Sequence, residues 1–584
     1  MFILYYQSIR GISVLSIFYL VTVDSLTVTT SEGTVVGSQA SDGNYVVFNG
    51  VPYAGSVSGE NRFKAAPPPS KYERQLNANN KVLCAQPGPD GPLGVEDCLT
   101  VNIYTKDEKP GKPVIVWLHG EDYSKTYNSQ TYSYKTYAES DIVAIEVNYR
   151  LSIFGFLCLR NKEAPGNAGL KDALQALKWI NKNVRSFGGD SNNVLLIGHG
   201  SGAAMVELLT LSQQTNKLIK KAIAMSGSAL SPWAIAYNPE ERARLIIKNI
   251  MQHNETPEYI SSINNIVTTL QTANLTTLIK AINKVANTFP DQTVLFAPCL
   301  ENENLNKPFL TDAPLDVLIS QNYNDISYIA GFVGEEGTMR MNEVQNNKWL
   351  EKMEQNFTNF LPVNMKFDSV EIKNNVSEVI RTKYFQGRVI NRATISNYLN
   401  YEGEVLVTNA VIKSASMRAK TSRKPVRLLA IMYREDTSKN NKWSHPDVPL
   451  YSLQHGRVMD YFLNDEAGSV SESCKLFLVK RTIAFAKNDI PTSMDGSEPG
   501  DVTWKHITTE HFNYLKISRP PALSSDREPR EFLLQDPPTT VSWDDFYGDH
   551  YMPPVYVSSG TKCFDSLISL TILFLVMYSK QDYL

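Results

Sequence analysis

The sequence lacks an excess of charge of one sign, an internal repeat, and a hydrophobic run long enough to cross a bilayer comfortably. Its 57 Lys and Arg residues and 60 Asp and Glu residues give a formal net charge of −3. No basic cluster stands out, which excludes the electrostatic footprint of a nucleic-acid-binding protein. No metal-ligand cluster, phosphate-binding loop or dinucleotide-binding motif is present, so neither a metal nor a cofactor is expected. Six cysteines in 584 residues allow one or two local bridges but no disulfide scaffold.

The N-terminus has the pattern of a secretory signal. Arg10 precedes an apolar stretch from Gly11 to Val23, which is short for a membrane span of about 20 residues. Small residues follow, with an acceptable cleavage site after Ser25. We therefore predict a signal peptide over residues 1–25, with a signal anchor as the alternative. Secretion agrees with four acceptor triplets for N-glycosylation, at Asn254, Asn274, Asn356 and Asn375.

The C-terminal tail, residues 549–584, contains a second short apolar run, from Leu567 to Tyr578. Small residues lie upstream at positions 558–560, which resembles the processing signal of a glycolipid (GPI) anchor. The polar ending after the run is atypical of such a signal. Membrane attachment through an anchor, a short membrane span and a plain amphipathic tail all remain open.

Between the two ends, residues 26–548 have the pattern of one large α/β domain. Continuous apolar runs at 114–118, 142–147 and 193–197 predict buried strands. Residues 169–184 carry apolar side chains at a spacing of 3.6 residues, which predicts an amphipathic helix. Buried strands that alternate with such helices favour a mostly parallel sheet covered on both faces.

Eight motifs are spread along nearly the whole of this domain. They are Phe48-Asn49-Gly50-Val51-Pro52-Tyr53-Ala54, Asn61-Arg62-Phe63, Glu96-Asp97-Cys98-Leu99, Asn148-Tyr149-Arg150, Gly166-Asn167-Ala168-Gly169, Phe187-Gly188-Gly189-Asp190, Met225-Ser226-Gly227-Ser228 and Trp543-Asp544-Asp545-Phe546-Tyr547. In this order they resemble the type-B carboxylesterase and cholinesterase family. The resemblance implies a single α/β-hydrolase domain, with a serine nucleophile, an acidic residue and a histidine in that chain order.

The same resemblance implies a small disulfide-closed loop just before the Glu-Asp-Cys-Leu signature. Cys84 and Cys98 stand at the two ends of that loop. The resemblance supplies no partner for Cys158, Cys299 or Cys474, which are expected to be buried free thiols. The state of Cys563, in the tail, is left open.

The position of the nucleophile is the main departure from the family. Enzymes of this fold place a serine in the pattern Gly-x-Ser-x-Gly, on a tight turn between a strand and a helix. This sequence has Gly198-His199-Gly200-Ser201-Gly202, so the flanking glycines are kept and the nucleophile position is Gly200. Ser201 stands one residue later, where such enzymes use a backbone N–H. A shift of one residue moves the hydroxyl by up to about 3.8 Å, so Ser201 is not expected to replace the nucleophile.

The oxyanion hole departs from the family at the same time. The resemblance implies a Gly-Gly-Gly run whose N–H groups stabilise the developing negative charge. Here that run is Gly120-Glu121-Asp122. Two carboxylates beside a forming oxyanion would oppose it, in a place where each donor normally contributes about 2.7–4 kcal/mol.

The other two members of the triad are present. Glu336 lies in the segment that resembles the acidic partner, and His455 lies in the segment of the base. In an intact triad the histidine activates a neighbouring hydroxyl. With no hydroxyl at position 200, we interpret Glu336 and His455 as a hydrogen-bonded structural pair.

Three functions are compatible with this degenerate triad. The first is a non-catalytic extracellular protein that acts in adhesion or recognition through a protein partner, like the neuroligins and neurotactin that the resemblance includes. The second is a ligand-binding pseudoenzyme that sequesters an apolar, ester-like small molecule. The third is an active carboxylic ester hydrolase with a rearranged site.

Overall fold

The computed structural model describes most of the domain and little of the two ends. The described residues are 8–9, 12–13, 26–126, 132–251, 262–286, 294–341, 348–432, 453–463, 472–491, 503–508, 510–518 and 530–534. The predicted signal peptide therefore lies almost wholly outside them, and so does the tail 549–584. Within the described residues, no helix combines the length and the apolar character needed to cross a membrane.

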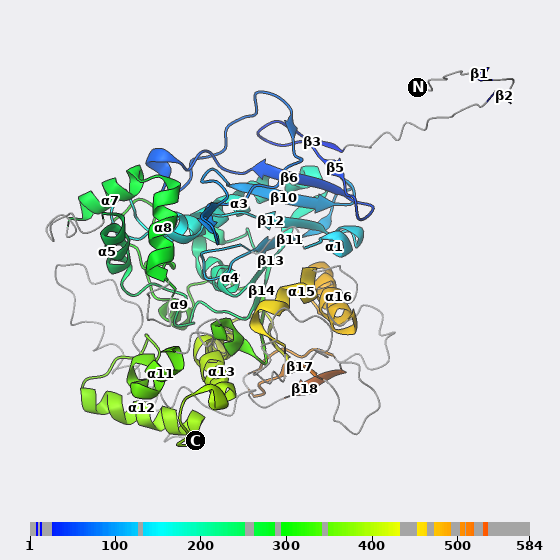
Figure 1. Ribbon diagram of the computed structural model, residues 1–584. Coiled ribbons are helices and arrows are strands. Elements are labelled where there is room, and N and C mark those ends of the chain that lie inside the picture. Colours follow the sequence, from blue (N-terminus) through cyan, green and yellow to red (C-terminus); the bar gives the residue numbers. More distant parts are fainter. Residues whose placement is uncertain are drawn as a thin grey trace.

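An eleven-stranded sheet forms the centre of the described part of the chain. Seven neighbouring strands, from β12 to β17, run parallel, and antiparallel strands extend the sheet at both edges. The order across the sheet is β18 (Arg530–Leu534), β17 (Tyr514–Ser518), β16 (Val426–Ile431), β15 (Ser327–Val333), β14 (Lys221–Met225), β13 (Gly189–His199), β11 (Lys112–Leu118), β12 (Val143–Val147), β10 (Thr100–Thr105), β6 (Val46–Pro52) and β5 (Ser38–Gln39). Figure 1 shows this twisted sheet between its helices.

Short strands outside the main sheet complete the β structure of the described residues. One sheet pairs β3 (Thr27–Thr29), β4 (Thr34–Val36) and β7 (Leu76–Asn77). Two hairpins pair β8 (Gln86–Pro87) with β9 (Pro92–Leu93), and β1 (Ser8–Ile9) with β2 (Ile12–Ser13).

Two hydrophobic cores cover the two faces of the sheet, because successive side chains of a strand point to opposite faces. In β11, Val114, Val116 and Leu118 belong to one core, while Ile115 and Trp117 belong to the other. The first core includes side chains from α3 (Ala168–Asn183), α4 (Ser201–Leu211) and α14 (Asn409–Thr421). The second includes side chains from α1 (Lys135–Glu139), α15 (Val458–Leu463) and α16 (Glu472–Asn488). The strands predicted at 114–118, 142–147 and 193–197 are thus confirmed as central parallel strands buried on both faces.

Most of the remaining helices lie in two groups beside the sheet, while α2 packs against α3 and α9 packs against α4 and α14. One group packs α5 against α7 and α8, and the other gathers α11, α12 and α13 (Figure 1). Their bounds are α2 (Ser152–Phe156), α5 (Pro239–Ile250), α7 (Ile263–Thr272), α8 (Leu275–Ala286), α9 (Pro314–Ser320), α11 (Lys348–Gln355), α12 (Val370–Phe385) and α13 (Ile395–Gly403).

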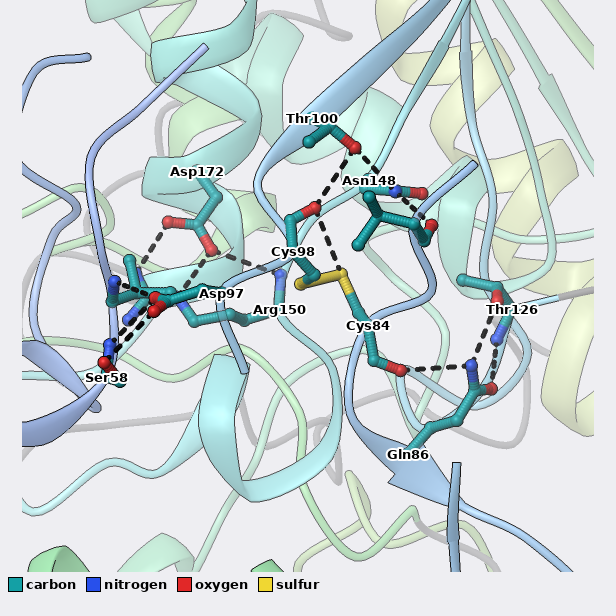
Figure 2. The surroundings of a disulfide bond; sticks show 12 residues. Ser58, Cys84, Gln86, Asp97, Cys98, Thr100, Thr126, Asn148, Arg150 and Asp172 are labelled. Atoms are coloured by element: carbon teal, nitrogen blue, oxygen red, sulfur yellow. Dashed lines mark hydrogen bonds and ion pairs between the residues drawn. A yellow bond between two sulfur atoms is a disulfide. The ribbon is translucent and has the colours of Figure 1, made fainter. Parts of the chain in front are cut away.

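The implied disulfide between Cys84 and Cys98 is present, with Cα atoms 5.0 Å apart. Figure 2 shows the polar contacts that hold its surroundings. Gln86 donates to the Cys84 carbonyl at 3.2 Å, and its own side-chain oxygen accepts the Thr126 N–H at 2.9 Å. Nearby, the buried Arg150 and Asp172 form an ion pair at 2.6 Å. The loop is therefore tied both to its own backbone and to the segment that follows β11.

The expectation that Cys158 and Cys299 are free thiols is wrong. They form a second disulfide across 141 residues of sequence. Asn167 brings the two segments together, because its side chain donates to the Cys299 carbonyl and accepts the Cys299 N–H, both at 2.8 Å. Two cysteines so far apart in the sequence form no short motif from which their pairing could be predicted. Neither the side chain of Cys474 nor Cys563 is among the described residues.

Both bridges are directly testable. We expect non-reducing peptide maps of the full chain to contain two linked pairs, Cys84 with Cys98 and Cys158 with Cys299. Removal of the second bridge by Cys158→Ser and Cys299→Ser should lower the free energy of unfolding by about 2–5 kcal/mol, because the unfolded chain regains the entropy of a long loop. Free thiols at either position in the native protein would contradict this pairing.

Candidate functional site: the turn at Gly200

The site is built on a tight turn between β13 and α4. Gly200 joins them with φ +57° and ψ −123°, a backbone conformation that glycine adopts readily and that strains other residues. The flanking glycines are required by space. A Cβ atom added to Gly198 would lie 2.3 Å from the Gly202 carbonyl oxygen, and one added to Gly202 would lie 2.3 Å from the Leu118 carbonyl oxygen. The turn therefore has the shape that a nucleophile elbow requires, with glycine at position 200.

Gly200 faces the histidine that the sequence indicated. A Cβ atom added to Gly200 would lie 3.5 Å from Nε2 of His455 and 3.7 Å from the Gly120 carbonyl oxygen. Nδ1 of His455 lies 2.5 Å from Oε2 of Glu336, and the other oxygen of Glu336 accepts the Val333 N–H at 2.8 Å. The structure thus brings position 200, Glu336 and His455 together in the geometry of a triad whose first side chain is a hydrogen atom.

The loops that carry Glu336 and His455 are fastened to each other. The Glu335 N–H donates to the Leu453 carbonyl, and the His455 N–H donates to the hydroxyl of Thr338, both at 3.0 Å. These bonds position the imidazole independently of any group at residue 200.

His455 is 13% exposed and surrounded by carboxylates. Burial alone would lower its pKa, but the Glu336 carboxylate, with Asp122 and Glu121, outweighs burial and raises the pKa of His455. The ring of His199 lies 4.7 Å away, centroid to centroid. Burial and the charge of His455 hold the pKa of His199 well below its usual value. His199 therefore stays neutral while its neighbour is charged.

The hydroxyl of Ser201 is directed to a different partner. Its Oγ accepts the Tyr123 N–H at 3.0 Å, and the side chain is 2% exposed. A Cβ atom added to Gly120 would lie 2.7 Å from this oxygen. Ser201 thus holds the loop after β11 through this hydrogen bond. Residue 120 has to be glycine because any side chain there would collide with the Ser201 hydroxyl.

The loop at the oxyanion position is a tight turn closed on itself. The Glu121 N–H donates to the Lys125 carbonyl at 2.9 Å, and the Lys125 N–H donates back to the Glu121 carbonyl at 3.1 Å. Asp122 and Tyr123 adopt φ +52° and +54°, in the left-handed region that favours glycine. The Tyr123 side chain is fully buried and donates to the Ala234 carbonyl at 3.1 Å. One N–H at an oxyanion position is therefore already bonded within the turn.

The carboxylates of Glu121 and Asp122 remain accessible to water. Partial desolvation by the surrounding protein, followed by the charge of Asp122, raises the pKa of Glu121. Both groups lie close enough to His455 to influence its protonation. The site thus presents negative charge where a hydrolase of this fold needs positive potential.

A buried contact between a histidine and a carboxylate, which the sequence analysis missed, lies next to this loop. His119 Nε2 lies 3.1 Å from Oε1 of Glu146, and both side chains are 4% exposed. Burial raises the pKa of Glu146, but His119, Lys81 and the Asn102 amide outweigh it and lower the pKa to about 2. A carboxylate within the apolar run 142–147 was the available signal, because a buried charge needs a partner.

Three comparisons with known proteins agree with this architecture. The model of the Carboxylesterase family matches residues 24–532. A carboxylic ester hydrolase of Bombus ignitus is 29% identical over 82% of this chain and 86% of its own. Venom carboxylesterase-6 of Apis mellifera is 26% identical over 82% and 88%. The crystal structure of juvenile hormone esterase from Manduca sexta, with OTFP covalently attached, superposes with a TM-score of 0.76 at 23% identity, over 90% of this chain and 99% of that one. The last likeness shows the α/β-hydrolase fold.

The raised pKa of His455 predicts how its contribution to stability depends on pH. The charged imidazole is favoured in the folded state, so its contribution is complete below the unfolded pKa of about 6.5 and fades as pH rises through the folded value. The difference in Tm between the wild type and His455→Gln should therefore be largest below about pH 6.5 and shrink as the pH rises through the folded value.

The exposed His506 provides the control, because His506→Gln also removes one imidazole. Its Tm should follow the wild type over the same range. A His455→Gln difference that grows with pH would contradict the assigned pairing with Glu336.

Proposed function

The chain belongs to the carboxylesterase family, and from that premise we propose that it is a non-catalytic member, which acts outside the cell in adhesion or recognition of a protein partner. The single observation that carries this proposal is the glycine at position 200. A Cβ atom added there would lie 3.5 Å from Nε2 of His455. The base and its carboxylate are in place, and the group that the base would activate is missing.

The surrounding residues support the same proposal. Ser201 is the nearest hydroxyl in sequence, but its oxygen is bonded to the loop and misplacement of a reacting group by 1 Å can already cost about a hundredfold in rate. The Glu121 N–H is committed to Lys125. Glu121 and Asp122 add charge of the sign that repels an oxyanion. The nucleophile position and the oxyanion site both differ from the family pattern, which favours a role other than hydrolysis.

The extracellular location is part of the proposal. It rests on the predicted signal peptide over residues 1–25, on the two disulfides and on the word venom in the name of one relative. Attachment to the outer face of the plasma membrane would run through the tail 549–584, as a glycolipid anchor or a short span. A freely secreted protein is the alternative.

A ligand-binding pseudoenzyme is the second candidate. The observation that favours it is the room for a small group at position 200, where an added Cβ atom would be in ordinary van der Waals contact, 3.5 Å from Nε2 of His455. A polar group of an otherwise apolar, ester-like molecule could lie there and be retained without turnover. Stabilisation of the protein against heat by such a molecule would favour this candidate over adhesion.

We expect the purified domain to hydrolyse p-nitrophenyl esters no faster than its Gly200→Ala variant. The alanine fills position 200 without supplying a hydroxyl, so the comparison isolates enzymatic turnover at this site from background. A burst of p-nitrophenol followed by steady turnover would refute the proposal and favour the third function, an active ester hydrolase with a rearranged site.

Activity should return when both defects are repaired. Gly200→Ser rebuilds the triad, but the carboxylates still oppose the oxyanion, in a place where a single donor is normally worth about 2.7–4 kcal/mol, or two to three decades in rate. The triple variant Gly200→Ser, Glu121→Gly, Asp122→Gly should therefore exceed the single variant clearly. Its matched control carries Gly200→Ala with the same two glycines and should stay inert. Ser201 is left unchanged because it accepts the Tyr123 N–H.

Two results would contradict this reasoning. Full activity of Gly200→Ser alone would show that Glu121 and Asp122 do not oppose the reaction. A folded but inert triple variant would show that Glu336 and His455 are misassigned or that substrate cannot reach them.

A further inference from the structure

Exposed apolar side chains gather on and just beyond α12. Among the residues that the structure describes, nine large hydrophobic side chains are exposed, and four of these are Val370, Ile372, Val379 and Val389. Val379 is 57% exposed and Ile372 is 37% exposed. Exposed apolar side chains that gather on one element, rather than being scattered singly, indicate a surface that a partner or an attached group covers.

The periodicity of the helix places an asparagine in the middle of this surface. With 3.6 residues per turn, Ile372, Asn375 and Val379 lie on one face, because they are three and four positions apart. The opposite face, with Ile380 and Tyr384, is buried against the domain. Asn375 is itself exposed, so its side chain lies between the two apolar ones on the solvent side.

We propose that Asn375 carries an N-linked glycan that covers the exposed apolar face of α12. The triplet Asn375-Val376-Ser377 has the acceptor pattern. In the transfer, Nδ2 of Asn375 forms a bond to C1 of the sugar and releases one proton. The bond from C1 to the diphosphate oxygen of a lipid-linked oligosaccharide donor breaks, and the lipid diphosphate leaves. The inference rests on the proposed extracellular location, which takes the chain past that donor.

The buried serine of the triplet sets the order of events. Ser377 is 4% exposed in the folded protein, so the triplet has to be recognised before α12 packs. The glycan is then already attached when α12 packs against the domain and leaves Ile372 and Val379 exposed. Its sugar rings offer apolar faces to these side chains and hydroxyls to water.

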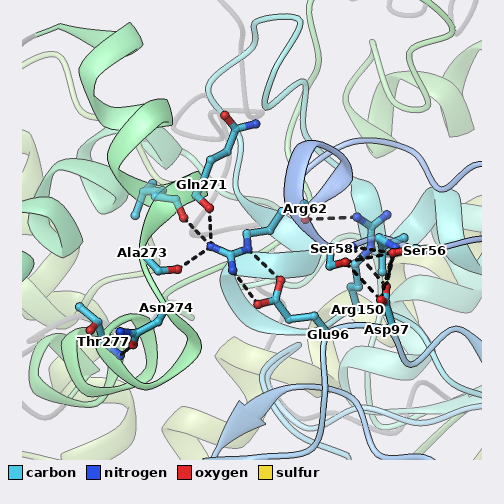
Figure 3. Close-up of polar contacts among 12 residues, drawn as sticks. Ser56, Ser58, Arg62, Glu96, Asp97, Arg150, Gln271, Ala273, Asn274 and Thr277 are labelled. Carbon is cyan, nitrogen blue, oxygen red and sulfur yellow. Dashed lines mark hydrogen bonds and ion pairs between the residues drawn. The ribbon is translucent and has the colours of Figure 1, made fainter.

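The other described acceptor triplets have different surroundings. Asn274 immediately precedes α8, and its Oδ1 accepts the Thr277 N–H at 2.8 Å. Arg62 donates to the carbonyl of the neighbouring Ala273 (Figure 3). At the third triplet, the hydroxyl of Thr358 donates to the side-chain oxygen of Asn356. Both asparagines are exposed, and neither lies between exposed large apolar side chains on one helical face. Modification of Asn274 or Asn356 would show that the chain is glycosylated, whereas only modification of Asn375 tests whether a glycan covers the apolar face of α12. Asn254 lies outside the described residues.

The glycan has a consequence for recognition. A branched sugar on Asn375 would keep a protein partner away from this face of α12. The partner surface of the proposed recognition function should then lie elsewhere on the domain.

The test begins with the full chain secreted from eukaryotic cells, its glycopeptides identified by mass spectrometry. Asn375 should be modified. The variant Asn375→Gln should lose that one glycan, bind more of a hydrophobic fluorescent dye and elute earlier from a sizing column through self-association. Asn374→Gln, one residue away on the same helix and also exposed, keeps the triplet and should behave as wild type. In Ile372→Ser, Val379→Ser, the loss of the glycan should no longer increase dye binding.

Each other outcome overturns something specific. Glycans on Asn274 and Asn356 but not on Asn375 would refute this inference and leave the extracellular location standing. A secreted product with no glycan on any of the three would also refute this inference, whereas a chain that stays inside the cell without any glycan would contradict the extracellular location as well. Loss of the glycan without added dye binding would refute its role as a cover. If Asn375→Gln is not secreted, the folded wild-type protein stripped of its glycans by an amidase gives the same comparison.

Discussion

The meeting of three strand ends at Gly200 is the constraint on which the rest of the site depends. A Cβ atom on Gly202 would collide with β11 at Leu118, and one on Gly227, just after β14, would lie 2.2 Å from the Gly200 carbonyl oxygen. The backbones of β11, β13, β14 and α4 thus come so close together that only glycine fits at the points of contact. This packing forces φ +57° on residue 200, whichever side chain it carries. The turn is therefore a property of the sheet, and it forms with glycine at position 200.

The charges around His455 support the proposal that this chain keeps the framework of a triad without its activity. Glu336 pairs with the imidazole whether or not a hydroxyl faces Nε2, so the pair stabilises the junction of two loops. Glu121 and Asp122 then act with Glu336 to favour the imidazolium. A general base has to be neutral before it takes a proton. The same carboxylates that oppose an oxyanion also favour the wrong form of the histidine for starting the reaction.

The sequence predicted the parts of the molecule whose physics is local. The apolar run 193–197 and the glycines at 198 and 202 indicated a buried strand and a tight turn, and the structure has both. The family motifs brought Glu336 and His455 to the same place. What stayed hidden depends on contacts distant in sequence: the bridge from Cys158 to Cys299, and the bond from Tyr123 N–H to Ser201, join segments that no spacing relates.

The central claim is that no side chain at this turn acts as a nucleophile, and covalent labelling tests it most directly. The purified protein would be incubated with an organophosphate that phosphorylates nucleophilic serines, and its intact mass would then be measured. The triple variant with a serine at position 200 serves as the positive control for access of the reagent. We expect the wild-type mass to stay unchanged while the control gains one phosphoryl group. A single adduct on the wild-type protein, mapped to the peptide that contains Ser201, would contradict the account.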